Sequence, residues 1–333
     1  IETIYRVENS LIETNISQTG RIQSQVEAKI IEAKSTPFSW ITKEFADEIE
    51  ESIFNDLRVL LFVNRKGYSP FTLCQDCSKP QLCPNCSLPL VLYKKDRDET
   101  KIRKFVCHHC LHEQNVPHTC AYCGSWKLKD FGLGIEKAEE EIKKLFPKAK
   151  NITIATEQIL SDSELIFDLV MIPSLDYLFT IPDFRINETV FRLITGLKTR
   201  ARKKIILQTR LLENKLFEYA MSGNVSSFYQ DEIKSREALS YPPFSILIKL
   251  SREDKNLSAL ETEEKKAIKF LGEFSPQAFP AYRQKIRNQF RWNILLKIEP
   301  VLIESKIGGE RLRSVLEQLS GMWHISVDPN SII

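Results

Sequence analysis

All eight cysteines of this 333-residue chain fall into four Cys-x-x-Cys pairs within one segment of about fifty residues. The pairs are Cys74/Cys77, Cys83/Cys86, Cys107/Cys110 and Cys120/Cys123. One such pair presents two thiolates to the same side of a metal ion, and two pairs complete the tetrahedral four-sulfur site typical of structural zinc. The count therefore predicts two zinc ions per chain. Each would sit in a closed site without an open position for catalysis.

Disulfide bonds or redox chemistry explain these cysteines less well. Disulfides need an oxidising compartment, but no secretory segment is recognisable here and no cysteine lies outside the segment. A redox Cys-x-x-Cys typically occurs once, at the start of a helix, rather than four times in succession. Structural zinc is the better interpretation.

The spacing of the cysteine pairs favours one way of sharing them between two sites. The gap from Cys86 to Cys107 has room for a hairpin with Leu88–Tyr93 and Phe105–Val106 as its arms. Such a hairpin pairs the two inner knuckles and leaves the outer two for the other site. Histidines in the same region could replace a cysteine, although with eight cysteines present we expect them beside the ligands or on the surface. They are His108, His109, His112 and His118.

Composition limits the class of protein. The chain is 42% hydrophobic and 27% charged, as ordinary globular proteins are. No apolar run approaches the roughly 18 residues of a membrane span, so no membrane contact is expected. The sequence begins with Ile1 and shows no targeting signal, and we expect a cytoplasmic protein or a fragment of one.

Net charge does not by itself indicate a nucleic-acid partner. The whole chain has a formal charge of +3. From Cys74 to Cys123 it has seven Lys/Arg and five Asp/Glu. Two four-thiolate zinc sites would bring this segment to about −2. Affinity for nucleic acid in this segment would therefore need locally clustered side chains.

Helical and strand patterns alternate on both sides of the cysteine segment. A strand-like run occurs at Val26–Ile31, an amphipathic helix is expected over 41–57, and a buried strand follows at Arg58–Asn64. Further along, helices are expected over 135–146 and 188–197, and strands over 151–155, 166–172 and 204–209. This order predicts an α/β fold with a parallel sheet, interrupted by the cysteine segment after its first strand.

From about Glu213 the pattern becomes that of a small α+β unit. Two helical stretches lead to Tyr241–Phe244, where two prolines end the helix and start an extended segment. Strands are then expected over 244–251, 290–298 and 323–327, and helices over 257–274 and 308–319.

Two basic clusters could contact phosphates or bases. The first places five cations in seven residues, which fits phosphate contact but also a solvated helix end. It consists of Lys198, Arg200, Arg202, Lys203 and Lys204. The second interleaves cations with aromatic rings, as in sites for single-stranded bases and also in amphipathic hairpins. It consists of Tyr282, Arg283, Lys285, Arg287, Phe290, Arg291 and Trp292.

Motifs for nucleotide hydrolysis are missing from the sequence. It contains no Gly-Lys dipeptide and hence no phosphate-binding P-loop, and it contains no Asp-Glu-x-His motif. Gly132-Leu133-Gly134 is too short a glycine pattern to indicate a phosphate site, and a tight turn explains it as well.

Several of these residues together resemble the PriA family of replication-restart helicases (primosomal protein N′). The resemblance begins with Leu60–Tyr68 followed by the four cysteine knuckles. It continues through Gly132–Glu136, Pro182–Arg185, Glu188, Phe191, Ile206–Thr209, Tyr241–Phe244, Arg291-Trp292 and Val327–Pro329. It implies a RecA-like second helicase lobe with an inserted two-zinc ribbon module, followed by a C-terminal DNA-binding domain. It also implies one zinc on the outer knuckles and one on the inner knuckles, which agrees with the hairpin argument.

The resemblance implies four segments. Residues 1–40 would be a remnant of the first helicase lobe and a linker, and residues 41–72 and 129–212 would form the second lobe. Residues 73–128 would form the zinc-binding module, and residues 213–333 the α+β DNA-binding domain. The positions implied or predicted to contact nucleic acid are Arg65, Lys66, Lys198, Arg200, Arg202, Lys203, Arg287, Arg291 and Trp292.

The sequence also departs from the family pattern. The family's first lobe is absent apart from Ile1–Ser10, and the Gly-Thr-Gln-Met motif is reduced to Ala155–Gln158. The arginine-finger run aligns with Gly196–Lys203, where Arg200 remains and Lys203 replaces the second arginine. Lysine cannot reproduce the planar fork that holds a transferring phosphoryl group.

We therefore expect a zinc-stabilised, PriA-like DNA-binding protein of replication restart whose motor is inactive or absent in this chain. Its expected partners are forked or single-stranded DNA and primosome proteins. Two alternatives stay open. The chain could be the C-terminal part of an active ATP-dependent 3′–5′ helicase, or a zinc-stabilised module that docks proteins.

Overall fold

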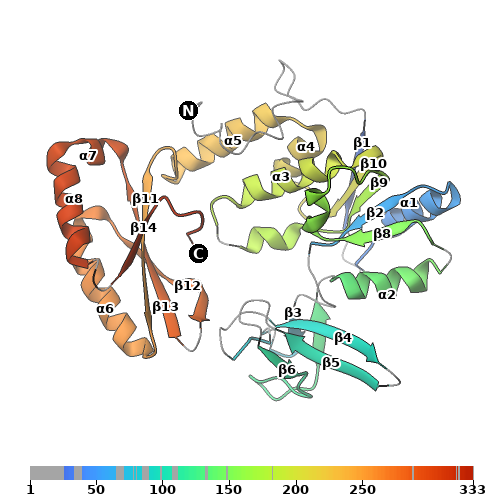
Figure 1. Cartoon of the computed structure of the whole chain (residues 1–333), viewed down its shortest axis with the longest axis horizontal. Coiled ribbons are helices and arrows are strands. Elements are labelled where there is room, and N and C mark those ends of the chain that lie inside the picture. Colours follow the sequence, from blue (N-terminus) through green and yellow to red (C-terminus); the bar gives the residue numbers. More distant parts are fainter. Residues whose placement is uncertain are drawn as a thin grey trace.

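The computed structural model describes most of the chain from residue 26 onward. The described ranges are 26–33, 40–64, 71–77, 79, 81–84, 90–97, 100–106, 112–131, 134–147, 149–181, 183–286, 289–319, 321 and 323–332. Their strands form four sheets. Figure 1 shows the elements in three groups: a parallel sheet between helices, a small insertion beside it, and an antiparallel sheet that carries helices on its outer side.

The largest sheet is parallel and has the strand order β1-β10-β9-β2-β8. Its strands are β1 (Glu27–Glu32), β2 (Val59–Phe62), β8 (Ile152–Ala155), β9 (Phe167–Ile172) and β10 (Ala201–Thr209). All four residues of β2 are buried, as a strand covered on both faces requires.

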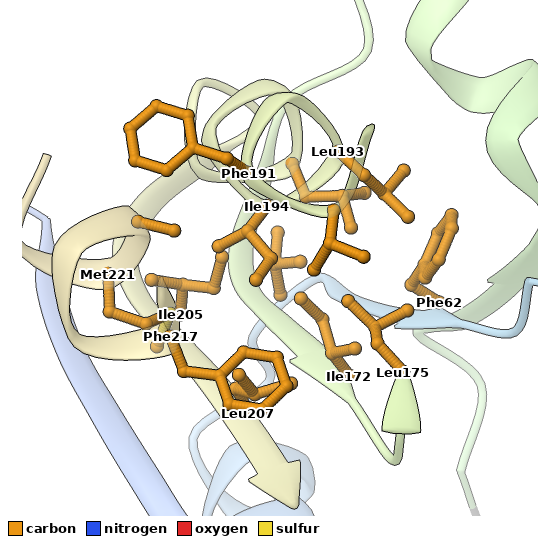
Figure 2. Packing of buried hydrophobic residues seen from close by; sticks show 14 of the residues in the cluster. Phe62, Ile172, Leu175, Phe191, Leu193, Ile194, Ile205, Leu207, Phe217 and Met221 are labelled. Carbon is orange, nitrogen blue, oxygen red and sulfur yellow. The ribbon is translucent and has the colours of Figure 1, made fainter. Parts of the chain in front are cut away.

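Helices cover both faces of this parallel sheet. On one face, α1 (Lys43–Phe54) and α2 (Ile135–Leu145) contribute Phe45 and Ile142 to a core that also contains Leu61. On the other face, α3 (Ile186–Lys198), α4 (Lys215–Ser222) and α5 (Val225–Ala238) pack over a core that contains Leu60. Figure 2 shows Ile194 of α3 and Phe217 of α4 beside Ile205 and Leu207 of β10 in this second core. The predicted α/β class with a parallel sheet is confirmed. We call this sheet and its helices the parallel-sheet unit.

The strand expected at Val26–Ile31 is β1, and it lies at the edge of the parallel sheet. It pairs in parallel with β10, from Glu27 opposite Lys204 to Glu32 opposite Thr209. Residues 27–32 are therefore part of the parallel-sheet unit. The charged residues Glu27, Lys29 and Glu32 of β1 suit an edge strand, because charged side chains discourage a further strand from pairing with the open side.

The cysteine-rich insertion lies between β2 and α2 and contains two small sheets. One pairs β3 (Phe71–Cys74) with β7 (Leu128–Phe131), and the other joins β4 (Val91–Arg97), β5 (Thr100–Val106) and β6 (Glu113–Asn115). The predicted hairpin between the inner knuckles is present as β4 and β5, which pair antiparallel. The core beneath this hairpin is formed by the buried side chains of Leu90, Leu92, Phe105 and Cys83.

The C-terminal sheet is antiparallel, with the order β12-β13-β11-β14. Its strands are β11 (Ile246–Asp254), β12 (Gln277–Ile286), β13 (Gln289–Ile298) and β14 (His324–Val327). Apolar residues of one face pack against α6 (Leu257–Phe270) and α8 (Lys306–Leu319), with α7 (Pro300–Glu304) alongside. The other face has an apolar end, where Leu247 and Leu295 meet Phe184 and Tyr241 of the preceding segments. The predicted α+β arrangement is confirmed.

Short 3₁₀ turns complete the described structure. They are Glu157–Ser161, Asp176–Thr180 and Gly272–Phe274. Among the residues that the structure describes, no helix has the length and apolar character needed to cross a membrane.

Candidate metal centre and nucleic-acid interface

The pairing of β3 with β7 brings the two outer cysteine knuckles together. Cys74 is the last residue of β3 and lies opposite Leu128, the first residue of β7. The backbone N–H of Gln75 donates to the Lys127 carbonyl at 2.9 Å, which extends the pairing beyond the strands. The two knuckles, 43 to 49 residues apart in sequence, therefore face one another.

The sulfur atoms of the outer knuckles have the spacing of a four-sulfur metal site. The Sγ atoms of Cys74 and Cys123 are 3.6 Å apart, and those of Cys77 and Cys120 are 3.7 Å apart. All four lie within 4.8 Å of one another. A tetrahedral zinc with Zn–S bonds of about 2.3 Å separates its sulfurs by about 3.8 Å. These four cysteines form a group that can hold a metal ion.

The acidities of these thiols show why a cation suits the group. Burial opposes ionisation of Cys120, but the N–H groups of Tyr122 and Cys123 outweigh it and lower its pKa to about 6. The Ser125 N–H favours the Cys123 thiolate, but burial and the neighbouring thiols outweigh it and raise the pKa of Cys123 to about 12. Four thiolates this close repel one another, and a divalent cation at their centre removes that repulsion.

Polar groups around the sulfurs hold the knuckles in place. Buried Gln81 donates through Nε2 to the Cys120 sulfur at 3.6 Å. Asp76 accepts hydrogen bonds from the Ser125 hydroxyl at 2.7 Å and from the Lys127 ammonium at 3.1 Å. These bonds tie the Cys74/Cys77 knuckle to the segment that follows Cys123. Such outer contacts orient metal ligands. Sequence reasoning did not identify Gln81, because no spacing rule marks a hydrogen-bond donor to sulfur.

The inner knuckles fall mostly outside the described residues. Cys83 is described and is buried beside Leu90 and Phe105. Cys86, Cys107 and Cys110 lie outside the described residues, as do His108 and His109. The second zinc site therefore stays a prediction.

A basic groove lies on the face of the C-terminal sheet that the helices leave uncovered. Strand alternation puts Ile248 and Leu250 of β11 on the helix side and Lys249 and Ser251 on the opposite side. The groove has a volume of about 690 Å³. Its lining includes Lys249, Ser251, Arg252, Arg291, His324 and Ser326. We call it the Arg291 groove.

Among the described residues, the cations Lys249, Arg252 and Arg291 and the carboxylate Glu253 line the Arg291 groove. Arg252 is itself paired with Glu263 of α6 at 3.3 Å. The Arg291 Nε donates to Glu253, its cross-strand neighbour, at 2.7 Å. The Lys249 ammonium donates to the Ser331 carbonyl at 3.2 Å. Burial and the positive charge of Arg291 lower the pKa of Lys249, and they outweigh the opposing effect of the Asp183 carboxylate. Lys249 and Arg291 therefore repel each other, and a phosphate placed between them would reduce this repulsion.

The chain as a whole is similar to several curated proteins of one name. No family model matches the chain. It is 30% identical over 338 residues to the replication restart protein PriA of Bacillus subtilis, covering 87% of this chain and 41% of that protein. The chain is PriA-like. A second relative of the same name, from Borreliella burgdorferi, is 28% identical over 373 residues, covering 100% of this chain and 55% of that protein.

A third relative shows the same partial coverage. Replication restart protein PriA of Thermotoga maritima is 29% identical over 296 residues, covering 77% of this chain and 38% of the relative. The PriA-like chain thus spans about half, or less, of the length of the relatives that it matches.

The first basic cluster of the PriA-like chain is largely engaged inside the protein. Lys198 is only 6% exposed, and its ammonium donates to the Met221 carbonyl at 2.6 Å. Burial lowers its pKa. Arg200 donates to the carbonyls of Ser163 and Leu160, both at 2.9 Å. Neither side chain is placed to meet a phosphate.

The remaining cations of that cluster point to different neighbours. The Lys204 ammonium lies 2.8 Å from Glu48 and 3.4 Å from Glu27. Lys203 is 3.9 Å from Asp168, and Arg202 is exposed. The structure therefore does not bring the five cations together as one patch.

The second cluster is divided between the two faces of the sheet. Arg291 lines the groove, whereas its neighbour Trp292 follows the alternation of Ile294 and Leu296 on the helix side. Arg65, Lys66 and Arg287 lie outside the described residues.

Proposed function

We propose that this chain is a DNA-binding protein of replication restart, with zinc in its four-cysteine group. The similarity to proteins named replication restart protein PriA supports the process, and the Arg291 groove is the observation that carries DNA binding. Forked or single-stranded DNA and other replication-restart proteins are the proposed partners, in the cytoplasm.

The metal proposal extends to two zinc ions. Cys74, Cys77, Cys120 and Cys123 would hold one, and their sulfur separations near 3.7 Å support this assignment. Cys83, Cys86, Cys107 and Cys110 would hold the other, by the spacing argument. Zinc would hold together an insertion whose described apolar core is small.

The proposed segments follow from the same comparison. Residues 41–72 and 129–212, now with β1, would be the second helicase lobe, and residues 73–128 the zinc module. Residues 213–333 would be the DNA-binding part. We also propose that the motor is inactive in this chain, because Arg200, at the position of the family's first arginine finger, is bound to two backbone carbonyls.

DNA binding is tested with a labelled fork and a single strand, by fluorescence anisotropy across a salt series. Affinity should fall steeply with salt, because phosphate contacts release counterions. Arg291→Ala and Lys249→Ala should each weaken binding to all sequences and reduce the salt slope by about one. The matched control is Arg313→Ala, which removes an 80% exposed cation from α8 and should leave binding unchanged.

The opposite result would favour the docking alternative. If both groove variants bind like the wild type, or if the fork does not bind at low salt, DNA is not the partner of this groove. A protein-docking role for the zinc-stabilised insertion would then replace the proposal.

A further inference from the structure

Two large aromatic side chains lie exposed on the cysteine-rich insertion, on either side of Cys123. Trp126 is 76% exposed and Tyr122 is 48% exposed. Aromatic rings of this size are usually largely buried, because they contribute much of the apolar area that folding removes from water. Neither ring is buried in a core of the described structure.

The backbone that carries the two rings is nevertheless firmly held. The N–H of Cys120 donates to the Ser125 carbonyl at 2.7 Å, and the N–H of Gly124 donates to the Cys120 carbonyl at 2.9 Å. Gly124 has a φ of +73°, a conformation that glycine adopts without steric cost. The N–H of Leu128 returns to the Trp126 carbonyl at 2.9 Å. The rings are therefore presented on a turn that is ordered before any ligand arrives, which lowers the entropy cost of binding.

Cations accompany both rings. The Lys79 ammonium lies 5.0 Å from the centroid of the Tyr122 ring. Lys127 follows Trp126 directly and is held by Asp76 at 3.1 Å. A negatively charged ligand could thus place its charge near Lys79 and Lys127 while an apolar ring stacks on Trp126.

The surroundings of the rings favour a nucleic acid over a protein. The neighbouring exposed residues are small or polar, namely Ala121, Gly124 and Lys127. Protein-docking sites usually present a contiguous apolar patch. Isolated aromatic platforms beside cations are the arrangement that binds successive bases of a single strand.

We propose that Trp126 and Tyr122 form a base-stacking site for single-stranded DNA, with Lys79 and Lys127 beside the phosphates. This site rests on the proposed DNA-binding function and extends it to a second surface, built from residues other than those of the Arg291 groove.

The emission of Trp126 gives a direct test. Of the four tryptophans, Trp323 is buried, and Trp40 and Trp292 are partly buried. A dT oligonucleotide of about 12 nucleotides, a length within known single-strand site sizes, should quench the fluorescence of the zinc-loaded protein. An abasic oligonucleotide of the same length should quench far less, because it has phosphates without bases. Trp126→Phe should lose the quenching but retain affinity.

Affinity measurements complete the test. Trp126→Ala should weaken dT binding by about five- to 150-fold, the usual range for losing a stacked base. Phe54→Ala is the matched control, since it removes a 90% exposed ring from the end of α1 and should change nothing. Zinc content equal to that of the wild type shows that Trp126→Ala has kept the fold of the insertion.

Two results separate this site from the proposed function. If the fork binds in an Arg291-dependent way, but dT neither quenches Trp126 nor binds more weakly to Trp126→Ala, the stacking site is wrong and the proposed function stands. If neither DNA binds at low salt, both are wrong.

Discussion

The ring of Phe184 stacks on the ring of Tyr241, with centroids 4.8 Å apart and planes 9° from parallel. Phe184 precedes α3 of the parallel-sheet unit, and Tyr241 precedes the first strand of the C-terminal sheet. The stack adjoins Leu247 and Leu295 on the groove face of that sheet. It therefore connects the parallel-sheet unit to the part of the chain that carries the Arg291 groove.

Arg236 joins the residues around this stack. Its guanidinium lies 5.2 Å from the centre of the Phe184 ring. Its Nε donates to Glu232 at 2.9 Å, and its Nη1 donates to the Pro242 carbonyl at 3.3 Å. Its Nη2 lies 2.7 Å from Glu188. Burial raises the pKa of Glu188 despite the attraction of Arg236. These carboxylates therefore depend on Arg236 for compensation.

Replacing Arg236 with alanine should destabilise the protein by about 3–5 kcal/mol, because it leaves the buried carboxylate of Glu232 without its cationic partner. The measurement is the urea midpoint at constant zinc. Arg313→Ala is the control, since Arg313 forms an i,i+4 pair with Glu317 in which both side chains are highly exposed. That pair should contribute no more than about 0.5 kcal/mol. Equal midpoints for the two variants would contradict the role given to Arg236.

At this junction the sequence pointed to the residues but did not predict the contact between them. Pro182–Arg185 and Tyr241–Phe244 were recognised from a family resemblance, which says nothing about their contacts. Phe184 and Tyr241 meet because two units pack, and no local periodicity encodes such a contact. Alternating helix and strand patterns, by contrast, predicted the parallel sheet well, since burial of one helical stripe or of a whole strand leaves a direct trace in residue order.

Zinc analysis of the purified protein should give about two ions per chain, since eight thiolates complete two four-sulfur sites. Cys120→Ser and Cys83→Ser should each reduce the count to about one, because they remove ligands from different proposed sites. Binding of structural zinc contributes on the order of 10–16 kcal/mol, so a strong chelator should unfold the insertion. A count near zero, with disulfides found by mass spectrometry, would remove the zinc assignment.

Charge clusters were harder to interpret from sequence than cysteines. Lys198 and Arg200 stand in a dense basic run, yet their partners, Met221, Leu160 and Ser163, come from other parts of the chain. Counting charges cannot reveal such partners. Strand β12 was not expected from the sequence, because Pro280 lies within it and proline cannot donate a hydrogen bond to a neighbouring strand. The proline is tolerated because β12 lies at the edge of its sheet.

Glu48 should make stability depend on acid pH. Burial disfavours its charge, but hydrogen bonds from Lys204 and Lys29 outweigh this and lower its pKa. Because the pKa of Glu48 is lower in the folded protein than in the unfolded chain, its charge stabilises the fold at pH values above the unfolded pKa, near 4.5. This stabilisation is lost as the pH falls through the folded pKa. Glu48→Gln should cost about 1–3 kcal/mol near neutral pH, and progressively less as the pH falls below that of the unfolded carboxyl.

The measurement for Glu48 is the urea midpoint as a function of pH for wild type and variant. Glu140→Gln serves as the control, because Glu140 pairs with Lys144 at the surface, with side chains 40% and 68% exposed. A constant difference between wild type and Glu48→Gln at all pH values would show that Glu48 acts through its shape and not its charge.

The last prediction concerns ATP. We expect no DNA-stimulated ATP hydrolysis by these 333 residues, and no gain from Lys203→Arg. The family resemblance would put Arg200 at the position of the first arginine finger, but its two terminal nitrogens donate to the carbonyls of Ser163 and Leu160. An arginine finger must instead point at the transferring phosphoryl group, where it contributes about 10³–10⁵ in rate. Arg200→Ala should therefore cost about 1.5–3 kcal/mol of stability, the range for charged hydrogen bonds, and change no turnover. Phosphate release is measured with and without DNA against a heat-inactivated sample. Hydrolysis above that background, lost in Arg200→Ala at unchanged stability, would show that Arg200 leaves its carbonyl partners and serves a working nucleotide site.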